Sequence, residues 1–546
     1  MIKIIEKFLN VIKEYFVIEK FKKHNKKIFN QESYDSKSII LVEFNAFQTS
    51  HIALSYVSNL LKKKFKVNVH AYYAYSVIVS RLKENLIIKI KWFLSNFFSL
   101  KNMGIYKSFG VKKIFKPNIS KEIEVKAKKV SDDIFKNLKS KGDLLNVFYK
   151  DVLIGDLIYD TYLKSLTNYT LDIKDMKLKN MIFEFYCLCF YWDNFFDKKN
   201  VKALLCIHTV YSYAIPIRVA IFKNISVYAM NMERLFSLSK TNYLKGTDFK
   251  YYPEEFKTLS LDDQKKGKKL AKQKLLDRFE GKTSTDIDLT YSMVSSFSKV
   301  VSKKNVIKQS KNIKVLIAPH DFMDSIHVMG DLLFPDFYEW LIYLGKISSK
   351  TNYDWYIKNR PKYPGKFKKY QPFTNKTVEE IVSIYPNLKL LDNEISHHQL
   401  IKEGINFVFT GYGSVGVEYP YFGIPVINAC ETNPHYRYNF NITPKTIKEY
   451  EGIILNLSQN ALKINNEEIY EFYFMRHVYH NRKWLTRSHK EMVKIVGGYN
   501  DQFSSKLYNY WVDNYSTKEH KLTENYINNF MQSGDFLLNI KHQKNF

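Results

Sequence analysis

The chain has 546 residues, more than one hydrophobic core usually supports, so two domains are expected. Hydrophobic residues make up 45% of the sequence and aromatic residues 16%, which excludes a disordered protein. Lys and Arg number 84 against 54 Asp and Glu, giving a formal net charge of +30. Because the lysines are scattered and no zinc-finger, RNA-recognition or basic-zipper spacing occurs, no nucleic-acid partner is expected.

Cysteine content and hydropathy indicate the compartment. The chain has no CxxC pair, and most of its few cysteines lie in apolar surroundings: Cys187, Cys189, Cys206 and Cys430. We therefore expect reduced core thiols, with neither a disulfide scaffold nor a metal site. No signal peptide is recognisable, and no apolar run approaches the roughly 18 residues that span a bilayer. These features predict a cytoplasmic protein that is soluble or peripheral to the inner face of the cytoplasmic membrane.

Residues 1–36 predict an amphipathic N-terminal helix. Its apolar residues recur at helical spacing among lysines: Ile5, Phe8, Leu9, Ile12 and Phe16. A second amphipathic stretch, residues 86–98, is more apolar and ends in aromatic residues. Two interpretations remain open. Either these stretches anchor the protein at a membrane interface, which basic helices with Trp and Phe favour, or they cover a domain core.

An N-terminal Rossmann-like domain is predicted over residues 37–235. Apolar runs typical of buried strands alternate there with helical patterns: strand 38–44, helix 52–61, strand 66–72, strand 203–207, helix 214–222 and strand 226–229. Strands that alternate with helices form parallel sheets, because each crossover helix returns the chain to the same edge of the sheet.

A second Rossmann-like domain is predicted over residues 306–460, after a lysine-rich helical linker at 236–305. The same alternation recurs, with strands 313–319, 355–358, 388–391, 407–410 and 425–428, and helices 336–346, 378–383 and 397–403. Residues 461–546 predict a C-terminal helical region. The predicted class is therefore α/β, with two Rossmann-like domains, parallel sheets and terminal helices.

The segment 410–418 is the strongest candidate for a binding site. It joins a buried strand to a short helix through a turn whose glycines let a ligand approach the backbone: Gly411, Gly413 and Gly416. The helix is expected to begin near Gly416, and the N–H groups from Gly413 through Ser414 and Val415 suit a phosphate. Glu418, in the first turn, either accepts hydrogen bonds from sugar hydroxyls or only complements the helix dipole.

Further segments carry a family resemblance: Gly155–Tyr162, His320–Ser325, Leu333–Trp340, Tyr353–Lys358 and the Gly-Ser-Val-Gly-x-Glu stretch that ends at Glu418. With the Gly-Ile-Pro-Val-Ile strand that follows, they resemble GT-B glycosyltransferases. More narrowly, they resemble bacterial capsule and surface-polysaccharide biosynthesis proteins of the Kdo-transferase-like group. The resemblance covers most of residues 38–455. It implies two Rossmann-like sheets facing each other across a cleft, with the donor nucleotide against the C-terminal domain and the acceptor against the N-terminal domain.

One motif departs from the family pattern. Related transferases usually carry Lys-x-His-Pro after a strand of the C-terminal domain, with the His on the donor phosphate, whereas this chain has Lys358-Asn-Arg-Pro361. The resemblance thus implies donor binding by Lys358 and Arg360. An Arg holds phosphate in bidentate geometry and stays charged near neutral pH, but it does not exchange a proton as His does. An alternative to donor binding with intact activity therefore stays open, in which Arg360 in place of the His has altered or abolished catalysis.

Additional donor contacts are expected from side chains at the carboxyl edge of the second sheet. His320 and Asp324 follow its first strand, at the edge where doubly wound sheets bind ligands. Their spacing matches no defined metal site, so no bound metal is expected. His397 begins a helix near the same edge, and it either contacts the nucleotide or simply lies at the helix start.

A glycosyl transfer needs a base that takes the proton of the acceptor hydroxyl. In the first domain, His51 is expected in the loop after the first strand, and His208 comes directly after a later strand. Either is a candidate base, with a structural histidine as the alternative. Asp156, with Asp160, is a further candidate for the base or for an acceptor contact, or it caps a helix. The sequence leaves this choice open.

The sequence thus predicts a glycosyltransferase. Its nucleotide-activated sugar donor would be a co-substrate, with no tightly bound cofactor, and its acceptor a capsule or surface polysaccharide or the lipid-linked precursor of one. A teichoic-acid-type polyol-phosphate transferase and a nucleotide-sugar 2-epimerase are the alternative enzymes. The alternative without activity is a membrane-surface scaffold of polysaccharide assembly that retains the fold.

Overall fold

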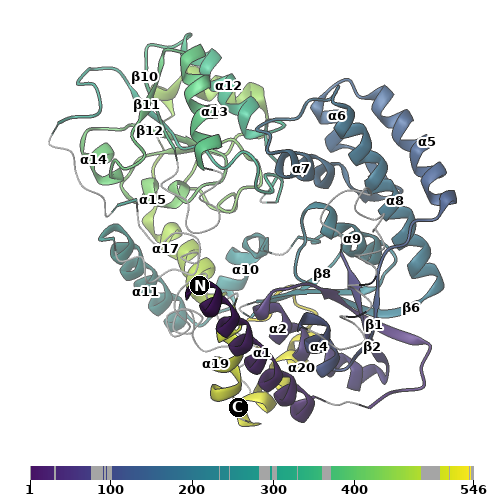
Figure 1. Cartoon of the computed structure of the whole chain (residues 1–546). Helices are drawn as coiled ribbons and strands as arrows, with labels where there is room; N and C mark the ends of the chain where they lie inside the picture. Colours follow the sequence, from purple (N-terminus) through teal and green to yellow (C-terminus); the bar gives the residue numbers. More distant parts are fainter. Residues whose placement is uncertain are drawn as a thin grey trace. The chain divides into compact units, whose positions relative to one another are not determined.

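In the computed structural model, the chain forms two compact units. Figure 1 shows the chain coloured from its N-terminus to its C-terminus. Unit 1 comprises Met1–Thr161, Ile173–Lys245 and Asn481–Phe546, and unit 2 comprises Tyr162–Asp172 and Gly246–His480. The structure describes these residues: 2–29, 32–74, 90, 94, 101–232, 234–244, 246–281, 296–297, 304–328, 330–359, 371–460, 462–480, 504–515, 517–539 and 542.

These units differ from the predicted domains in three places. The N-terminal helix belongs to unit 1 rather than standing apart, and residues 162–172 join unit 2. The C-terminal region is divided, since residues 461–480 belong to unit 2 and residues 481–546 return to unit 1. Of the amphipathic stretch 86–98, only Ile90 and Leu94 lie within the described residues.

Unit 1 is built on a six-stranded sheet with the order β3-β2-β1-β6-β7-β8. Its strands are β1 (Ser38–Phe44), β2 (Asn68–Tyr73), β3 (Val111–Phe115), β6 (Asn200–Cys206), β7 (Ser226–Met230) and β8 (Leu235–Leu238). All neighbours pair in parallel except β7 and β8, which pair antiparallel. The central strand β1 is buried on both faces, which explains the apolar run from Ile39 to Val42.

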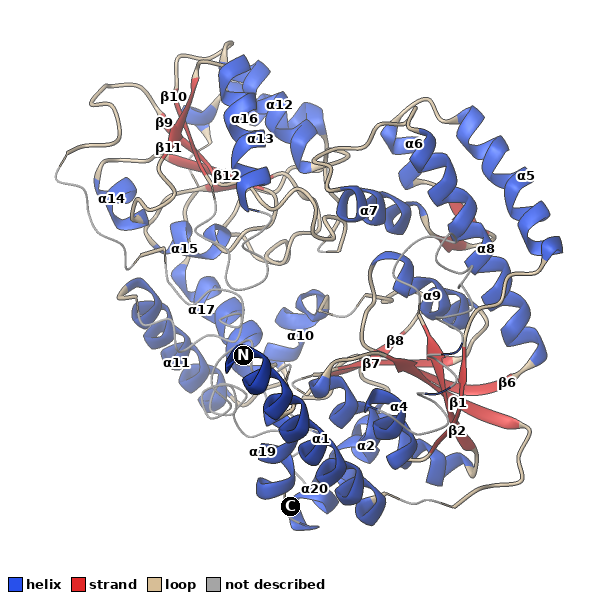
Figure 2. Cartoon of the chain, viewed as in Figure 1, coloured by secondary structure: helices blue, strands red, loops and turns tan. Residues whose placement is uncertain are grey.

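Helices cover both faces of this sheet (Figure 2), with α2 and α4 on one side and α8 and α9 on the other. The helices are α1 (Ile2–Ile28), α2 (Gln48–Phe65), α4 (Lys101–Ser108), α5 (Lys121–Asn137), α6 (Lys141–Leu145), α8 (Met176–Lys198), α9 (Ile215–Phe222), α19 (Lys506–Asn514) and α20 (Thr517–Ser533). A short hairpin joins β4 (Phe148–Tyr149) to β5 (Val152–Leu153), and α7 (Gly155–Leu166) follows it. Residues of α19 and α20 complete the core under α1 and α2.

Unit 2 contains a five-stranded, fully parallel sheet with the order β11-β10-β9-β12-β13. Its strands are β9 (Lys314–Ile317), β10 (Asp354–Lys358), β11 (Leu388–Leu391), β12 (Phe407–Thr410) and β13 (Val426–Asn428). Its helices are α10 (Tyr252–Lys257), α11 (Leu261–Phe279), α12 (Phe337–Ser348), α13 (Gln371–Ile384), α14 (His397–Lys402), α15 (Val415–Tyr421), α16 (Ile447–Leu455) and α17 (Asn466–Phe474), followed by a π-helical turn at Met475–Tyr479.

Both sheets share one topological feature. In each, the first strand of the sheet lies at the centre, and the chain winds from it first to one side and then to the other, as in Rossmann-like domains. The strand order therefore reverses beside β1 in unit 1 and beside β9 in unit 2. Ligands of such sheets bind outside the carboxyl ends of the strands at this switch point.

The predicted fold class, α/β with two Rossmann-like domains, is confirmed. Strands β1, β11 and β12 coincide with the predicted ranges. None of the helices within the described residues has the length and apolarity to cross a bilayer. The cleft between facing sheets stays a prediction.

Candidate active site

The switch point of unit 1 brings together Glu43 and His208. Glu43 is the penultimate residue of β1, and His208 follows the neighbouring strand β6. The Nδ1 atom of His208 lies 2.8 Å from Glu43 Oε1. Glu43 Oε2 accepts the backbone N–H groups of Ile207 at 2.6 Å and His208 at 3.2 Å. One carboxylate therefore holds both the main chain and the ring at the end of β6.

This pairing fixes the state of both side chains. Burial alone would raise the pKa of Glu43, but the charge of His208 and the hydrogen bonds from its ring and from the two N–H groups outweigh it and lower the pKa. Because an ionised carboxylate only accepts, His208 Nδ1 must carry the proton of that bond. The other nitrogen, Nε2, has no hydrogen-bond partner among the described residues. In the neutral imidazole this nitrogen carries the lone pair, so the ring has the arrangement of a base that a carboxylate orients.

Aromatic rings hold the imidazole of His208 in place. Tyr213 stacks on it with ring centroids 4.9 Å apart, and Phe47 lies 5.4 Å away. His208 itself remains partly exposed. The sequence indicated His208 as a candidate but missed Glu43, although a single acidic residue inside an otherwise apolar strand was a usable signal.

His51, the other histidine candidate, lies in the first turn of α2 and not in the loop where it was expected. Its side chain is 0% exposed. Its Nδ1 lies 2.5 Å from the Tyr508 hydroxyl and its Nε2 lies 3.0 Å from the Asn45 carbonyl oxygen. With both nitrogens engaged inside the core, this geometry is that of a structural histidine; a direct role stays a prediction that the geometry does not favour.

The stability of unit 1 is expected to fall on mild acidification because of His51. Burial lowers its pKa to about 4, against roughly 6.5 in an unfolded chain. As the pH falls below about 6.5, the unfolded chain takes up a proton that the folded unit rejects, which lowers the free energy of unfolding by about 2 kcal/mol between pH 7 and pH 5. Urea unfolding at both pH values should show a loss that is smaller by about this amount in His51→Gln than in wild type. Part of the loss should remain in the variant, because burial also lowers the pKa values of His70 and His435. An equal loss in that variant would contradict the assignment.

Asp156, the carboxylate candidate, is engaged in a buried ion pair. Both of its oxygens accept from the guanidinium of Arg218, each at 2.6 Å. Arg218 is 2% exposed, also donates to the Leu153 carbonyl oxygen, and lies over the ring of Tyr243. Such bidentate pairing leaves Asp156 poorly suited to take a proton, and it fixes the start of α7 against α9 instead. The neighbouring Asp160 is buried as well.

In unit 2, the predicted turn lies at the carboxyl end of β12, beside β9. The helix α15 begins at Val415, one residue before the predicted start. Gly416 N–H donates to the Gly413 carbonyl, and Gly413 N–H to Thr410 Oγ1. The N–H groups of Ser414 and Val415 have no partner within the described part of the chain. Two adjacent donors are thus available at the switch point, the chemistry that a phosphate oxygen needs.

The glycines of this turn are explained by packing within the protein. A Cβ atom at Gly411 would lie 2.6 Å from Phe337, and one at Gly416 would lie 2.5 Å from the ring of His435. At Gly413 it would meet Thr410 Oγ1 at 2.9 Å. At Gly411 and Gly416, the missing Cβ therefore makes room for the protein's own aromatic rings. The sequence had led us to expect room for a ligand there.

His320 lies directly against the turn. Its Nε2 is 3.3 Å from the N–H of Tyr412 and 3.4 Å from Thr410 Oγ1. Its ring packs between Phe337, at 5.0 Å, and Tyr412, at 4.5 Å. Since His320 follows β9 and the turn follows β12, the two strands that flank the switch point of unit 2 each contribute one part of the candidate donor site.

Glu418 has a partner that the sequence did not reveal. It is 4% exposed, and its Oε1 accepts from Arg278 Nε at 2.8 Å and Nη2 at 2.6 Å. Arg278 stands in the last turn of α11, a helix rich in lysines, so no sequence signal distinguished it. Glu418 Oε2 has no hydrogen-bond partner among the described residues. The carboxylate is therefore oriented by one oxygen and has the other available to a ligand.

The remaining donor candidates are distributed more widely. Asp324 Oδ1 accepts from Lys164 Nζ at 2.9 Å and is half exposed. Lys358 ends β10 and is buried, while Arg360 lies outside the described residues. His397 Nδ1 lies 2.7 Å from the hydroxyl of Tyr419, on the buried side of α15. The structure thus brings His320 to the turn and turns the His397 ring toward the protein interior.

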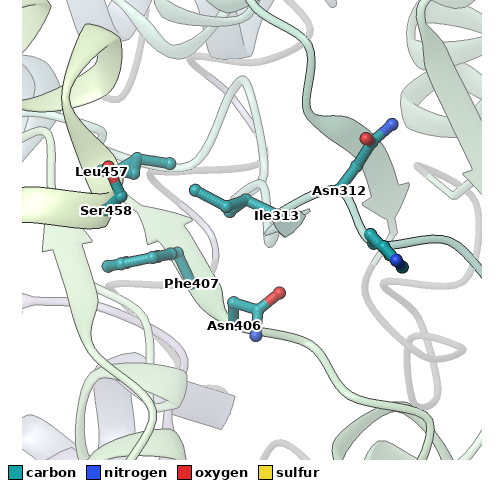
Figure 3. Close-up of a pocket in the computed structure, with 7 residues that line it drawn as sticks. Asn312, Ile313, Asn406, Phe407, Leu457 and Ser458 are labelled. Atoms are coloured by element: carbon teal, nitrogen blue, oxygen red, sulfur yellow. The ribbon is translucent and has the colours of Figure 1, made fainter.

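Two surface depressions lie elsewhere. Figure 3 shows the first, of about 270 Å³, which is lined at the amino ends of β9 and β12 by Asn312, Ile313, Asn406, Phe407, Leu457 and Ser458. The second, of about 380 Å³, adjoins the amino ends of β6 and β7. Both lie at the opposite edge of their sheet from the switch-point side chains. Within the described residues, no group of three or more His, Cys, Asp or Glu side chains is placed to hold a metal ion.

No protein-family model matches the chain, and no curated protein matches its sequence. Similar solved structures include a beta-Kdo 2,4-transferase, KpsC, of Thermosulfurimonas dismutans, with 10% identity, 50% of this chain and 79% of that chain covered, and a TM-score of 0.30. A UDP-GlcNAc 2-epimerase of Neisseria meningitidis shares 10% identity over 80% of this chain and 98% of that chain, with a TM-score of 0.22.

A glycosyltransferase of Rickettsia africae shares 10% identity, with 88% of this chain and 100% of that chain covered and a TM-score of 0.23. None of these likenesses reaches a TM-score of 0.5. The assignment of the fold therefore rests on the chain's own sheets and their strand order.

Proposed function

We propose that the protein transfers a sugar from a nucleotide-activated donor to a capsule or surface polysaccharide, or to its lipid-linked precursor. The observation that carries the proposal is the presence of complementary chemistry at the two switch points. Unit 1 has a carboxylate-oriented histidine there, and unit 2 has a turn whose Ser414 and Val415 N–H groups find no partner in the described parts of the chain. One suits the activation of a hydroxyl and the other the binding of a phosphate.

In this proposal His208 acts on the acceptor. Its Nε2 takes the proton of the acceptor hydroxyl while that oxygen bonds to the anomeric carbon of the donor and the bond from this carbon to the phosphate oxygen breaks. Glu43 holds the opposite nitrogen and stabilises the imidazolium that forms, since its carboxylate is already ionised. A charged partner at this distance also keeps the ring in the tautomer that a base requires.

The donor lies at the turn of unit 2. The N–H groups of Ser414 and Val415 would hold a phosphate of the donor, and His320 supports the same turn, since its Nε2 accepts from the Tyr412 N–H. The free oxygen of Glu418 would accept from a sugar or ribose hydroxyl, with Arg278 as the positioning residue that fixes its direction. Lys358 and Arg360 would add positive charge that stabilises the leaving phosphate.

Substituting Glu418 is expected to weaken donor binding. A hydrogen bond to a charged group contributes roughly 1.5–3 kcal/mol, so Glu418→Gln should raise the donor Kd about 10- to 100-fold, measured by calorimetry. Arg278→Gln should have a smaller effect in the same direction. The matched control is Glu379→Gln, an exposed carboxylate of α13 that should leave the Kd unchanged. Unchanged donor binding in Glu418→Gln would contradict the proposed donor site.

Analysis of the product separates the alternatives. A polyol-phosphate transferase leaves phosphorus in the polymer, a 2-epimerase converts its nucleotide sugar without any acceptor, and a scaffold binds no donor. The proposed transferase releases the nucleotide only when an acceptor is supplied and adds a sugar without phosphorus.

A further inference from the structure

Helix α1 has two distinct apolar faces. Its second half packs on unit 1 through Ile18, Phe21 and Asn25, all buried. Phe21 stacks on Tyr508 of α19 with ring centroids 4.2 Å apart. Figure 2 shows α1 alongside α19, and α4 adjoins it as well. This face accounts for the attachment of the helix to the body of unit 1.

The second apolar face points away from the protein. Ile12, Tyr15 and Phe16 are 37%, 56% and 66% exposed. Phe21 follows Ile12 by nine positions, which is two and a half helical turns, so the two side chains lie on opposite sides of α1. The exposed stripe is therefore no continuation of the packed face.

Along the same outward side, the apolar stripe is followed by lysines. Lys23 and Lys27 share the direction of Phe16 and Ile12, with Lys26 beside them, and all three lysines are exposed. None of the three has an ion-pair partner within the described residues. The whole helix carries eight lysines against three glutamates. The outward side of α1 is thus apolar at Ile12, Tyr15 and Phe16 and basic at Lys23, Lys26 and Lys27.

We propose that this outward face of α1 docks on a bilayer of anionic phospholipids. Aromatic and aliphatic side chains enter the boundary between headgroups and acyl chains, and neighbouring lysines meet the lipid phosphates. A second copy of the chain is a poor partner for this face, because each copy has a formal net charge of +30 and repels the other. An anionic lipid surface supplies both the apolar phase and the opposite charge.

Vesicle flotation tests this docking. The purified full chain is mixed with vesicles of phosphatidylglycerol and phosphatidylcholine, or of phosphatidylcholine alone, at 0.1 M salt. Wild type should float with the anionic vesicles only. The double variant Ile12→Asn/Phe16→Asn should partition about tenfold more weakly. The variant Lys23→Gln/Lys26→Gln/Lys27→Gln should lose roughly a hundredfold, since each lysine near the surface contributes roughly fivefold.

The control is Val125→Asn, which removes an exposed apolar residue from the lysine-bearing helix α5 and should float as wild type does. Melting curves should match for all variants, because every substituted side chain is exposed. The proposal fails if wild type does not float with anionic vesicles, or if both α1 variants float like wild type. It also fails if light scattering shows a wild-type dimer that Ile12→Asn/Phe16→Asn dissociates without lipid. Flotation needs no donor or acceptor, so it is independent of the proposed catalytic function.

Discussion

Replacing His208 by Gln is expected to lower kcat about 1000-fold while the donor Kd stays within a factor of two. A positioned general base typically contributes roughly 100- to 10,000-fold, and Nε2 of His208 is the unengaged nitrogen of a carboxylate-oriented imidazole. Because the ring lies at the unit 1 switch point, its loss should not disturb the turn in unit 2. Steady-state kinetics and calorimetry on the same preparation measure the two quantities.

Glu43→Gln should lower kcat less than His208→Gln does. The amide can still accept from Nδ1 but lacks the charge that stabilises the imidazolium, so a loss of about 10- to 100-fold is expected. His70→Gln, a histidine of β2 in the same unit, is the matched control and should keep kcat. If kcat in His208→Gln remains within threefold of wild type, His208 is not the base.

The second large effect is expected on stability. Asp156→Ala leaves the guanidinium of Arg218 buried without its carboxylate, and breaking a buried pair from one side costs about 3–5 kcal/mol. Urea unfolding should therefore show a free energy of unfolding lower by this amount. Replacing both partners, as Asp156→Leu/Arg218→Met, should cost less, since no charge then remains buried.

Activity distinguishes this structural role from a catalytic one. At a temperature where Asp156→Ala is folded, its kcat should stay within tenfold of wild type. The exposed neighbour Asp151 is the control, and Asp151→Ala should change stability by less than about 0.5 kcal/mol. A folded Asp156→Ala protein with a kcat reduced 1000-fold would instead make Asp156 the base.

The elements of the fold were predictable where local pattern determines them. A strand buried on both faces has a largely apolar sequence, and β1 and β12 could be bounded from such runs alone. The turn before α15 was equally local, since Gly, Ser and a following acidic residue mark a helix start. Its Pro420 lies inside the helix, and the Gly416 carbonyl that it cannot pair with accepts from Asn441 instead.

Partners distant in sequence were not predictable. Glu43 and His208 are 165 positions apart, and Arg278 and Glu418 are 140 apart. Each pair is formed by tertiary structure alone, so the residue types gave candidates without partners. For the same reason His51 and His208 looked alike in sequence, both near strand ends, although one lies inside the core against Tyr508 and the other at the surface. The antiparallel β8 and the return of residues 481–546 to unit 1 also depend on distant packing.

A thermal-shift screen with CMP-, UDP-, GDP- and CDP-linked donors measures directly whether the protein binds a nucleotide-activated sugar. A ligand that binds only the folded state raises the melting temperature by mass action. We expect one class of nucleotide-activated sugar to raise the Tm of wild type by roughly 2–5 °C at a concentration about 100-fold above its Kd, and the free sugar to leave the Tm unchanged. If none of the four classes raises the Tm at millimolar concentration, the protein is not a nucleotide-sugar transferase.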